Sequence, residues 1–386
     1  VSGALSGNPI TAETIVNNGG EVTSVRSDAV TPTEVPDSVA PTVSINGKAL
    51  TANADDNRFI IYRGANFNPT FGVRDDKNNV TLTITNLPNG VGNISKNGSK
   101  EFNYTIPNNT VADDAPFGES TATVVANDGR NTATYKFKYR IVDVQAGNTN
   151  PENRPIGSEL GDPHSHLKVA DSATSDNDKY YPTGMQFKWT ELNLSTLQPT
   201  DVPTTTKLNE VGNVTKYLPT AVFPNVVNTK TIDGVNYTIY TPAKKIVLKT
   251  FDVTDSVAPT VKMTNPTNNT ESVLGSNENA LPVVEVFRGS TLNIPLKMYD
   301  NNTNGKINVK HISGLPTGVN LNNGNTLSQN SGSETNPATA TITGRVAANA
   351  ELGTKVVTLK VSDDATGNVD KGNQATLKFK VKTYDL

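Results

Sequence analysis

Residues 37–43 read DSVAPTV, and the same seven letters return at residues 255–261. We call each copy an opening heptapeptide. An exact repeat at long range indicates an internal duplication, in which each copy begins one structural module. Pro41 and Pro259 lie at the same place in the two copies, where a fixed φ stiffens the chain.

The chain that follows each heptapeptide carries the same landmarks in the same order. They are the pairs Arg63-Gly64 and Arg288-Gly289, Asp75 and Asp300, 87–91 (LPNGV) and 315–319 (LPTGV), Gly118 and Gly353, and 133–138 (ATYKFK) and 375–380 (ATLKFK). Chance would easily match one pair but not five in register. The sequence therefore predicts two homologous modules.

The last stretch of each module alternates apolar and cationic residues. In the first copy Tyr135, Phe137 and Tyr139 alternate with Lys136 and Lys138. Successive side chains of a strand point to opposite faces, so one face is apolar and the other is cationic. We expect a half-buried strand with a solvated outer face, in preference to a binding surface for an anionic polymer.

Composition limits the class of protein. Only 34% of the 386 residues are hydrophobic, 18% are charged, the net charge is −3, and there is no cysteine. This balance favours thin β-sandwiches, and no stretch shows a sustained helical stripe. No basic cluster indicates a nucleic-acid partner, and no apolar run is long enough for membrane insertion. The lack of cysteine argues against an exported eukaryotic protein held by disulfides.

The fold predicted is all-β, with tandem Ig-like or cadherin-like β-sandwich modules in an elongated array, because about seven short strands alternate with turn signals in each module. The expected divisions are residues 1–37 as a linker or the tail of a preceding module, 38–145 as the first module, 146–254 as a distinct β domain with a loop-rich start, and 255–386 as the second module. Within the middle domain, Asp233-Gly234 predicts a β-hairpin. The chain begins at Val1 and ends at Leu386 directly after a strand, so we expect a monomeric fragment of a longer protein.

A Leu-Pro-x-Gly-Val element, the later stretch from Gly353 to Asn368, and the alternating last strand resemble the Ig-like and cadherin-like modules of bacterial surface proteins. The opening heptapeptide and the richness in Asn and Thr resemble Gram-positive cell-wall adhesins, in particular the giant matrix-binding proteins of staphylococci. The first module departs from the pattern, with 127–131 (NDGRN) in place of the Asp-Asp turn. The resemblance implies export, display at the bacterial cell surface, and attachment to a host matrix protein such as fibronectin, to a glycan, or to neighbouring cells.

The loop at residues 300–305 (DNNTNG) has the oxygen-rich pattern of a Ca²⁺ site. Oxygen ligands at alternate positions followed by Gly305 suit calcium, but the twelfth position is His311 rather than Glu. The alternative is an Asn-Gly turn, which needs the same residues for backbone reasons. The equivalent loop of the first module, residues 75–78 (DDKN), is a poorer candidate because Lys77 brings a positive charge. The candidate ligands, with carboxylates added from a second loop, are Asp300, Asn302, Asn304, Asp363 and Asp364.

Two aromatic or imidazole clusters lie in the middle domain. Trp189 with Tyr180 and Tyr181 is a candidate ligand-binding platform for a sugar, although a lone Trp at alternating spacing is more often part of a core. His164 and His166 form a pair that lacks the third and fourth ligands of a stable transition-metal site, so a polar loop is favoured.

Nothing in the sequence has the pattern of a reaction centre. Cysteine is absent, there are three histidines, and neither a Gly-x-Ser-x-Gly element nor a phosphate-binding glycine loop occurs. We therefore expect a non-catalytic adhesin fragment. The alternatives are a structural stalk that projects a separate binding domain and, more distantly, a carbohydrate-binding accessory module. No cofactor other than Ca²⁺ is expected.

Overall fold

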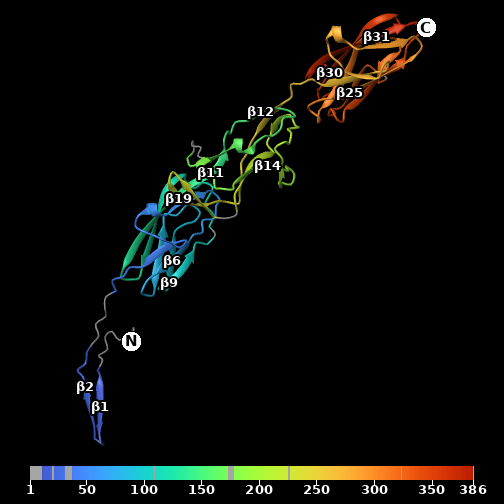
Figure 1. The fold of residues 1–386 in the computed structure, drawn as a ribbon. Coiled ribbons are helices and arrows are strands. Elements are labelled where there is room, and N and C mark those ends of the chain that lie inside the picture. Colours follow the sequence, from blue (N-terminus) through green and yellow to red (C-terminus); the bar gives the residue numbers. More distant parts are fainter. Residues whose placement is uncertain are drawn as a thin grey trace. The chain divides into compact units, whose positions relative to one another are not determined.

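The computed structural model describes residues 11–19, 21–30, 37–107, 109–172, 178–224, 227–322 and 324–385. Within these residues the protein is all-β, with no α-helix and four short 3₁₀ turns: η1 (Ala54–Asp56), η2 (Pro163–His166), η3 (Asp178–Tyr180) and η4 (Glu278–Ala280) (Figure 1). No helix among them is long and apolar enough to cross a membrane. Strands β1 (Glu13–Asn18) and β2 (Glu21–Arg26) form an antiparallel hairpin. The rest of the predicted 1–37 segment includes residues 1–10 and 31–36, which lie outside the described residues.

The chain divides into two compact units. The first consists of residues 1–143, 170–183 and 224–243, and the second of residues 144–169, 184–223 and 244–386. The predicted middle domain, 146–254, therefore contributes to both units, instead of forming a separate body.

The first unit contains a two-sheet sandwich built from residues of the first module, with a later hairpin, residues 228–240, added to one of its sheets. One sheet has the order β4-β3-β6-β9, and the other has the order β18-β19-β5-β11-β10-β7-β8. The strands are β3 (Thr42–Ile45), β4 (Lys48–Ala49), β5 (Arg58–Tyr62), β6 (Thr70–Arg74), β7 (Val80–Thr85), β8 (Ile94–Gly98), β9 (Glu101–Thr105), β10 (Gly118–Asn127), β11 (Thr132–Ala146), β18 (Asn228–Ile232) and β19 (Val235–Tyr240).

The second module is a sandwich with the corresponding strand order. Its sheets have the orders β23-β22-β25-β29-β27 and β24-β31-β30-β26-β28. In both modules the strand before the Arg-Gly landmark pairs parallel with the last strand, β5 with β11 and β24 with β31. The strands are β22 (Thr260–Asn265), β23 (Thr270–Val273), β24 (Val283–Phe287), β25 (Thr291–Tyr299), β26 (Lys306–Ser313), β27 (Val319–Leu321), β28 (Thr326–Asn330), β29 (Ala338–Arg345), β30 (Gly353–Ser362) and β31 (Gln374–Tyr384).

The remaining part of the second unit has a different pattern. Its strands form the sheets β12-β21-β16 and β15-β14-β17-β20 around a core that contains Trp189, Phe251 and Leu208. The strands are β12 (Glu152–Pro155), β14 (Gln186–Leu192), β15 (Pro199–Val202), β16 (Gly212–Val214), β17 (Tyr217–Val222), β20 (Lys244–Ile246) and β21 (Phe251–Thr254), whereas β13 (Leu167–Ala170) belongs to neither sheet and pairs with β11.

Two of the repeated glycines are required by the backbone. Gly90 and Gly318, in the Leu-Pro-x-Gly-Val elements, have φ values of 95° and 94°. A Cβ atom at these positions would lie 2.3 Å from the carbonyl oxygen of Thr110 and 2.2 Å from that of Arg345. Only glycine fits such a conformation and such a close approach of backbone, so this landmark marks the same tight packing in both modules.

The repeated arginines also make the same contact in each module. The Nε atom of Arg63 donates to the carbonyl oxygen of Ala115 (2.8 Å), and that of Arg288 donates to the carbonyl oxygen of Ala350 (2.7 Å). In both cases the guanidinium satisfies a carbonyl in the loop before the penultimate strand. The landmark is therefore structural in both copies.

The predicted hairpin around Asp233-Gly234 is formed, but it belongs to the sheet of the first module. Asp233 and Gly234 both have positive φ (51° and 77°), as a two-residue hairpin turn requires. Residues 238–240 of β19 pair parallel with residues 59–61 of β5. The expected end of the first module at residue 145 excludes this hairpin. The sequence of a hairpin predicts its two strands, but it does not specify which other strand they join.

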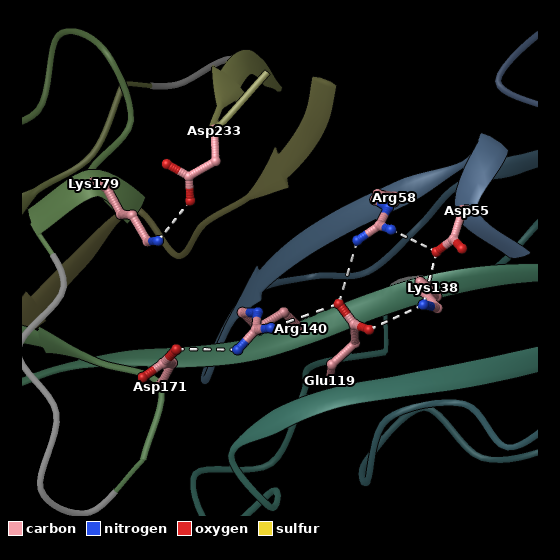
Figure 2. A network of polar contacts seen from close by, with 8 residues as sticks. All are labelled: Asp55, Arg58, Glu119, Lys138, Arg140, Asp171, Lys179 and Asp233. Carbon is pink, nitrogen blue, oxygen red and sulfur yellow. Dashed lines mark hydrogen bonds and ion pairs between the residues drawn. The ribbon is translucent and has the colours of Figure 1, made fainter. Parts of the chain in front are cut away.

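The cationic face of β11 lies against acidic side chains (Figure 2). Lys138 contacts Asp55 (2.7 Å) and Glu119 (3.2 Å), and Arg140 contacts Glu119 (3.5 Å) and Asp171 (3.0 Å). Lys136 remains exposed. The alternation predicted for this strand is correct, but acidic partners, as well as solvent, balance the charge of its outer face.

Candidate functional site

The acidic residue of each opening heptapeptide turns the chain toward the first strand of its module. Asp37 accepts a hydrogen bond at Oδ1 from the backbone N–H of Val39 (3.1 Å), and Asp255 accepts one from Val257 (3.3 Å). Such Asx turns fix a local backbone reversal without neighbouring strands. The repeated Asp is thus placed identically at the start of both modules.

In the second module, Asn373 ties the heptapeptide to the loop before the last strand. Its Nδ2 atom donates to the carbonyl oxygen of Asp255 (3.2 Å) and to Oδ2 of Asp363 (2.5 Å), and its backbone N–H donates to Oδ1 of Asp363 (2.6 Å). A Cβ atom at Gly372, where φ is 70°, would lie 2.1 Å from Oδ1 of Asp363. Glycine at this position therefore leaves room for the carboxylate.

The first module contains the same arrangement. Asn131 donates from Nδ2 to the carbonyl oxygen of Asp37 (3.4 Å), and its backbone N–H donates to Oδ1 of Asp128 (2.6 Å). The backbone N–H groups of Asn131 and Arg130 hold the pKa of Asp128 below its usual value. In both modules, therefore, an Asn side chain links the opening heptapeptide to an Asp of the loop before the last strand. We call these acidic residues and their Asn the acidic constellation of each module; the sequence landmarks indicated only part of it.

Asp300 lies near the acidic constellation of the second module and is buried, with an exposed fraction of 7%. Its Oδ1 atom accepts a hydrogen bond from the backbone N–H of Asn302 (3.0 Å), but its buried Oδ2 atom has no hydrogen-bond partner among the described residues. Burial raises the pKa of Asp300 to about 6, and the charges of Asp255 and Asp363 contribute to the increase. Three carboxylates thus influence one another at this end of the module.

Asp75 occupies the equivalent position in the first module. Its Oδ2 atom accepts a hydrogen bond from the backbone N–H of Lys77 (3.2 Å), whereas its buried Oδ1 atom has no partner among the described residues. Oδ2 of Asp37 is also buried and also has no hydrogen-bond partner among the described residues. Burial raises the pKa of Asp75, and the charge of Asp128 adds to the effect.

Two of the predicted calcium ligands are engaged elsewhere. The side chain of Asn304 donates to the carbonyl oxygen of Asn209 (2.8 Å). Oδ2 of Asp364 accepts from the backbone N–H groups of Thr366 and Asn368 (3.0 Å each), so Asp364 stabilises its own turn. Of the predicted set, Asp300 and the backbone of Asn302 are joined by a hydrogen bond, and the charge of Asp363 acts on Asp300.

The sequence-based set of candidate ligands does not include Asp255, whose charge also acts on Asp300. This residue lies 45 positions before Asp300 and belongs to the opening heptapeptide, which was identified as a repeat and not as a site. The signal available in the sequence was the recurrence of Asp at the start of both modules. Within the described part of the chain, no group of three or more His, Cys, Asp or Glu side chains could hold a metal ion.

The predicted aromatic platform is not formed. Trp189 is fully buried, its Nε1 atom donates to the carbonyl oxygen of Gly161 (2.8 Å), and its ring packs near Phe251. Tyr180 is 6% exposed and belongs to the first compact unit, together with Tyr181. Stacking on a sugar needs an exposed ring face, so Trp189 serves as a core residue.

The two histidines of the predicted pair make separate contacts. His164 stacks on Phe187, with ring centroids 4.1 Å apart. His166 approaches Glu152 through Nδ1 (3.3 Å), and the same carboxylate contacts the buried Lys249 (3.0 Å). Burial lowers the pKa of His166, although the nearby charge of Glu152 opposes this effect.

Comparison with known proteins relates the chain to staphylococcal matrix-binding proteins. Over 244 residues, or 62% of this chain, it is 27% identical to the extracellular matrix-binding protein ebh of Staphylococcus aureus strain MW2 and to the extracellular matrix-binding protein EbhB of strain N315. The chain spans 2% and 6% of the lengths of these two relatives. No model of a known protein family matches the sequence.

Solved structures similar to the chain include tandem Ig and cadherin domains. Titin domains I67–I69 match 90% of this chain and all of theirs, with 9% identity and a TM-score of 0.36. Domains EC1–3 of Drosophila N-cadherin match 86% of this chain and 98% of theirs, with 10% identity and a TM-score of 0.21.

Proposed function

We propose that this chain is a non-catalytic part of a bacterial cell-surface adhesin that attaches the cell to host matrix or to neighbouring cells. The observation that supports the proposal most directly is the sequence relationship, over 62% of the chain, to proteins named for binding extracellular matrix. The proposal places the protein outside the cell. Parts of a longer chain would anchor it to the cell wall.

A second candidate function is that of a stalk, which projects a binding domain located elsewhere. It is favoured by the duplication, because the two modules share both their landmarks and their strand order. A spacer needs stable, repeated modules and no ligand-specific surface. By contrast, the strands at residues 184–223, which match neither module, favour a binding role for this chain itself.

Binding measurements separate these functions. The purified 386-residue chain is passed over immobilised fibronectin and, in parallel, over immobilised serum albumin as a control surface. Saturable binding to fibronectin alone supports an adhesin in which this chain contacts the matrix. If the chain binds neither surface and no sugar on a glycan array, the stalk function replaces the binding function.

The glycan array also tests the carbohydrate-binding alternative. Because Trp189 is buried, this alternative lacks the aromatic platform on which it relied. Specific binding to one glycan class, without binding to fibronectin, would nevertheless establish it and would contradict attachment to a matrix protein.

A further inference from the structure

The outer face of the last strand is covered in the first module and open in the second. In the first module, Tyr62 of β5 lies opposite Val142 of β11, and both side chains are fully buried. At the same positions of the second module, Phe287 of β24 lies opposite Tyr384 of β31. Phe287 is 46% exposed and Tyr384 is half-buried. The second module therefore exposes an aromatic pair at a position that the first module covers.

The aromatic pair points away from the core of its own sandwich. Val286 and Val381 belong to the hydrophobic core of the second module. Successive side chains of a strand alternate between its faces, so Phe287 and Tyr384, each an odd number of positions away, lie on the outer face. Their ring centroids are 5.6 Å apart. Contiguous exposed apolar side chains mark interaction sites, and aromatic residues are enriched in protein interfaces.

The first module shows what kind of segment covers this face. Residues 170–172 and 178–183 belong to the same compact unit as the first module. The hydroxyl of Tyr62 donates to the carbonyl oxygen of Tyr180 (2.9 Å). Arg140 pairs with Asp171 (3.0 Å), and its guanidinium lies 5.7 Å from the centroid of the Tyr180 ring (Figure 2 shows the pair of Arg140 and Asp171). The covering segment therefore binds through an acidic side chain and a tyrosine.

The second module presents a cation at the position that binds this acid. Alignment of the stretches ATYKFK and ATLKFK places Lys382 where the first module has Arg140. Thr354, which follows Gly353, stands where the first module has Glu119, the carboxylate that contacts Arg140 at 3.5 Å. The second module has thus kept the cation and lost the carboxylate of its own sheet that would balance it.

The charged residues around the aromatic pair leave this face cationic. Nζ of Lys382 lies 4.7 Å from the centroid of the Tyr384 ring, and Nζ of Lys380 donates to the carbonyl oxygen of Glu278 (3.3 Å). Glu285 lies on the same face and accepts a hydrogen bond from the hydroxyl of Tyr384 (2.7 Å). Two lysines thus stand beside one carboxylate, and opposite charge on a partner is favoured.

We propose that the outer face of β24 and β31 docks an extended, acidic, tyrosine-containing segment of another protein. The segment of this chemistry in the present chain, residues 170–183, is engaged on Tyr62 and Arg140 of the first module. The occupant of the second module therefore comes from a different polypeptide. This inference goes beyond the proposed function, because it applies equally to an adhesin and to a stalk.

The partner lies on the face of the sheet and does not extend it as a further strand. At the outer edge of β24, the carbonyl oxygen of Val283 accepts from the side chain of Asn265 (2.8 Å), and the N–H of Glu285 donates to Oγ1 of Thr267 (3.2 Å). These backbone groups are no longer available for strand pairing. Recognition therefore depends on the side chains of Phe287, Tyr384 and Lys382.

NMR titration of the full, ¹⁵N-labelled 386-residue chain with a synthetic peptide tests the proposal. The peptide probe has the sequence of residues 170–183, ADSATSDNDKYYPT. Saturable shifts are expected at residues 283–287 and 380–384, with one peptide per chain, because the first module is already covered. A peptide with Asp171→Asn and Tyr180→Ser should bind at least about tenfold more weakly.

Phe287→Ser and Lys382→Gln should weaken binding of the unmodified peptide about tenfold and about fivefold, respectively. Val273→Ser and Lys297→Gln are the matched controls. Val273 is an exposed apolar residue (60%) and Lys297 an exposed lysine, and both lie on the other sheet of the same module. They should leave the dissociation constant unchanged. Circular dichroism verifies that each variant is folded.

The proposal is overturned if several millimolar peptide causes no saturable shift on β24 and β31, or if Phe287→Ser binds as tightly as the wild type. Sedimentation of the chain alone distinguishes a second occupant. If the wild type forms dimers that Phe287→Ser abolishes, the face joins two copies of this chain, and the proposed partner is wrong. None of these outcomes alters the fibronectin measurement, which concerns a different property.

Discussion

At the scale of single residues, the repeated glycines distinguish two kinds of constraint. Gly318 and Gly353 have similar φ values, 94° and 99°. A Cβ atom at Gly318 would collide with backbone, whereas one at Gly353 would meet nothing within 4 Å. The pair therefore separates the cost of backbone strain from the cost of lost space.

We expect Gly318→Ala to destabilise the second module more than Gly353→Ala. The strain of positive φ costs about 1–3 kcal/mol in either variant. The collision with the carbonyl oxygen of Arg345 adds about 1–3 kcal/mol for Gly318→Ala only. Urea unfolding of both variants measures the difference. Equal losses would show that the loop relaxes around the new methyl group.

A second residue-scale prediction concerns His166, whose pKa is lowered by burial. The folded state then binds a proton less readily than the unfolded state, whose histidine titrates at about 6.5. Stability should therefore be fully present above about pH 6.5 and should be lost as the pH falls toward the lowered pKa of the folded protein. Glu152 and Asp162 oppose the shift, and Lys249 and Arg154 reinforce it.

The measurement compares the free energy of unfolding of the wild type and of His166→Gln at about pH 7 and about pH 5. The variant should lose less stability on acidification than the wild type. His164→Gln is the control, since its ring stacks on Phe187 instead of approaching Glu152. If His166→Gln shows the same pH dependence as the wild type, other groups carry the effect.

Single-residue patterns predicted part of the acidic constellation but not its composition. Asp300 and Asp363 were identified because each lies in a turn rich in oxygen ligands. Asp255 was not, because its role depends on contact with loops far away in sequence. Local spacing describes a linear loop well, and it does not describe contacts among three separate segments.

At the scale of elements, the two modules protect the same sheet edge in different ways. The outer edge of β5 is covered by β19. On β24, the side chain of Asn265 donates to the carbonyl oxygen of Val283 (2.8 Å), and the N–H of Glu285 donates to Oγ1 of Thr267 (3.2 Å). Exposed strand edges promote association between chains, so both devices block unwanted pairing.

The ion pairs of Arg140 connect β11 to the segment 170–183 (Figure 2). We expect Arg140→Gln to loosen this segment, because the variant loses the contacts with Asp171 and Glu119. The side chain of Arg140 is only 25% exposed and that of Asp171 13%, so the pair is worth more than a surface ion pair of about 0–1 kcal/mol. Hydrogen exchange over residues 170–172 and 178–183 should become faster.

Lys188→Gln is the control for Arg140→Gln. Lys188 pairs with Asp201 (2.5 Å), but the two side chains are 38% and 61% exposed. This pair is therefore screened by solvent, and exchange around it should change little. If exchange in 170–183 is unchanged in Arg140→Gln, then other contacts of this segment hold it against the sheet.

The elements themselves were largely predictable, whereas their partners were not. The alternation of apolar and cationic residues predicted β11 and β31, and Asp233-Gly234 predicted the hairpin of β18 and β19. Nothing local in the hairpin identifies β5 as its neighbour, because backbone pairing is not specific to sequence. The expected boundaries around residues 146–254 differ from the compact units for this reason.

At the scale of the whole molecule, two large cores belong to two different units. Phe137 is fully buried in the first unit and packs against Phe59, with ring centroids 5.4 Å apart. Phe379 occupies the matching position in the second module and is also fully buried. Matched substitutions at these positions therefore test whether the two cores fold independently.

We expect Phe137→Ala and Phe379→Ala each to lower one calorimetric transition of the full chain. Replacing a buried Phe by Ala costs about 3–5 kcal/mol, which corresponds to a decrease of roughly 6–20 °C in the affected transition. The other transition should stay where it is in the wild type, since neither substitution touches the other core. A variant that lowers both transitions equally would show that the units unfold as one, and repeated modules would then not be independent folding units.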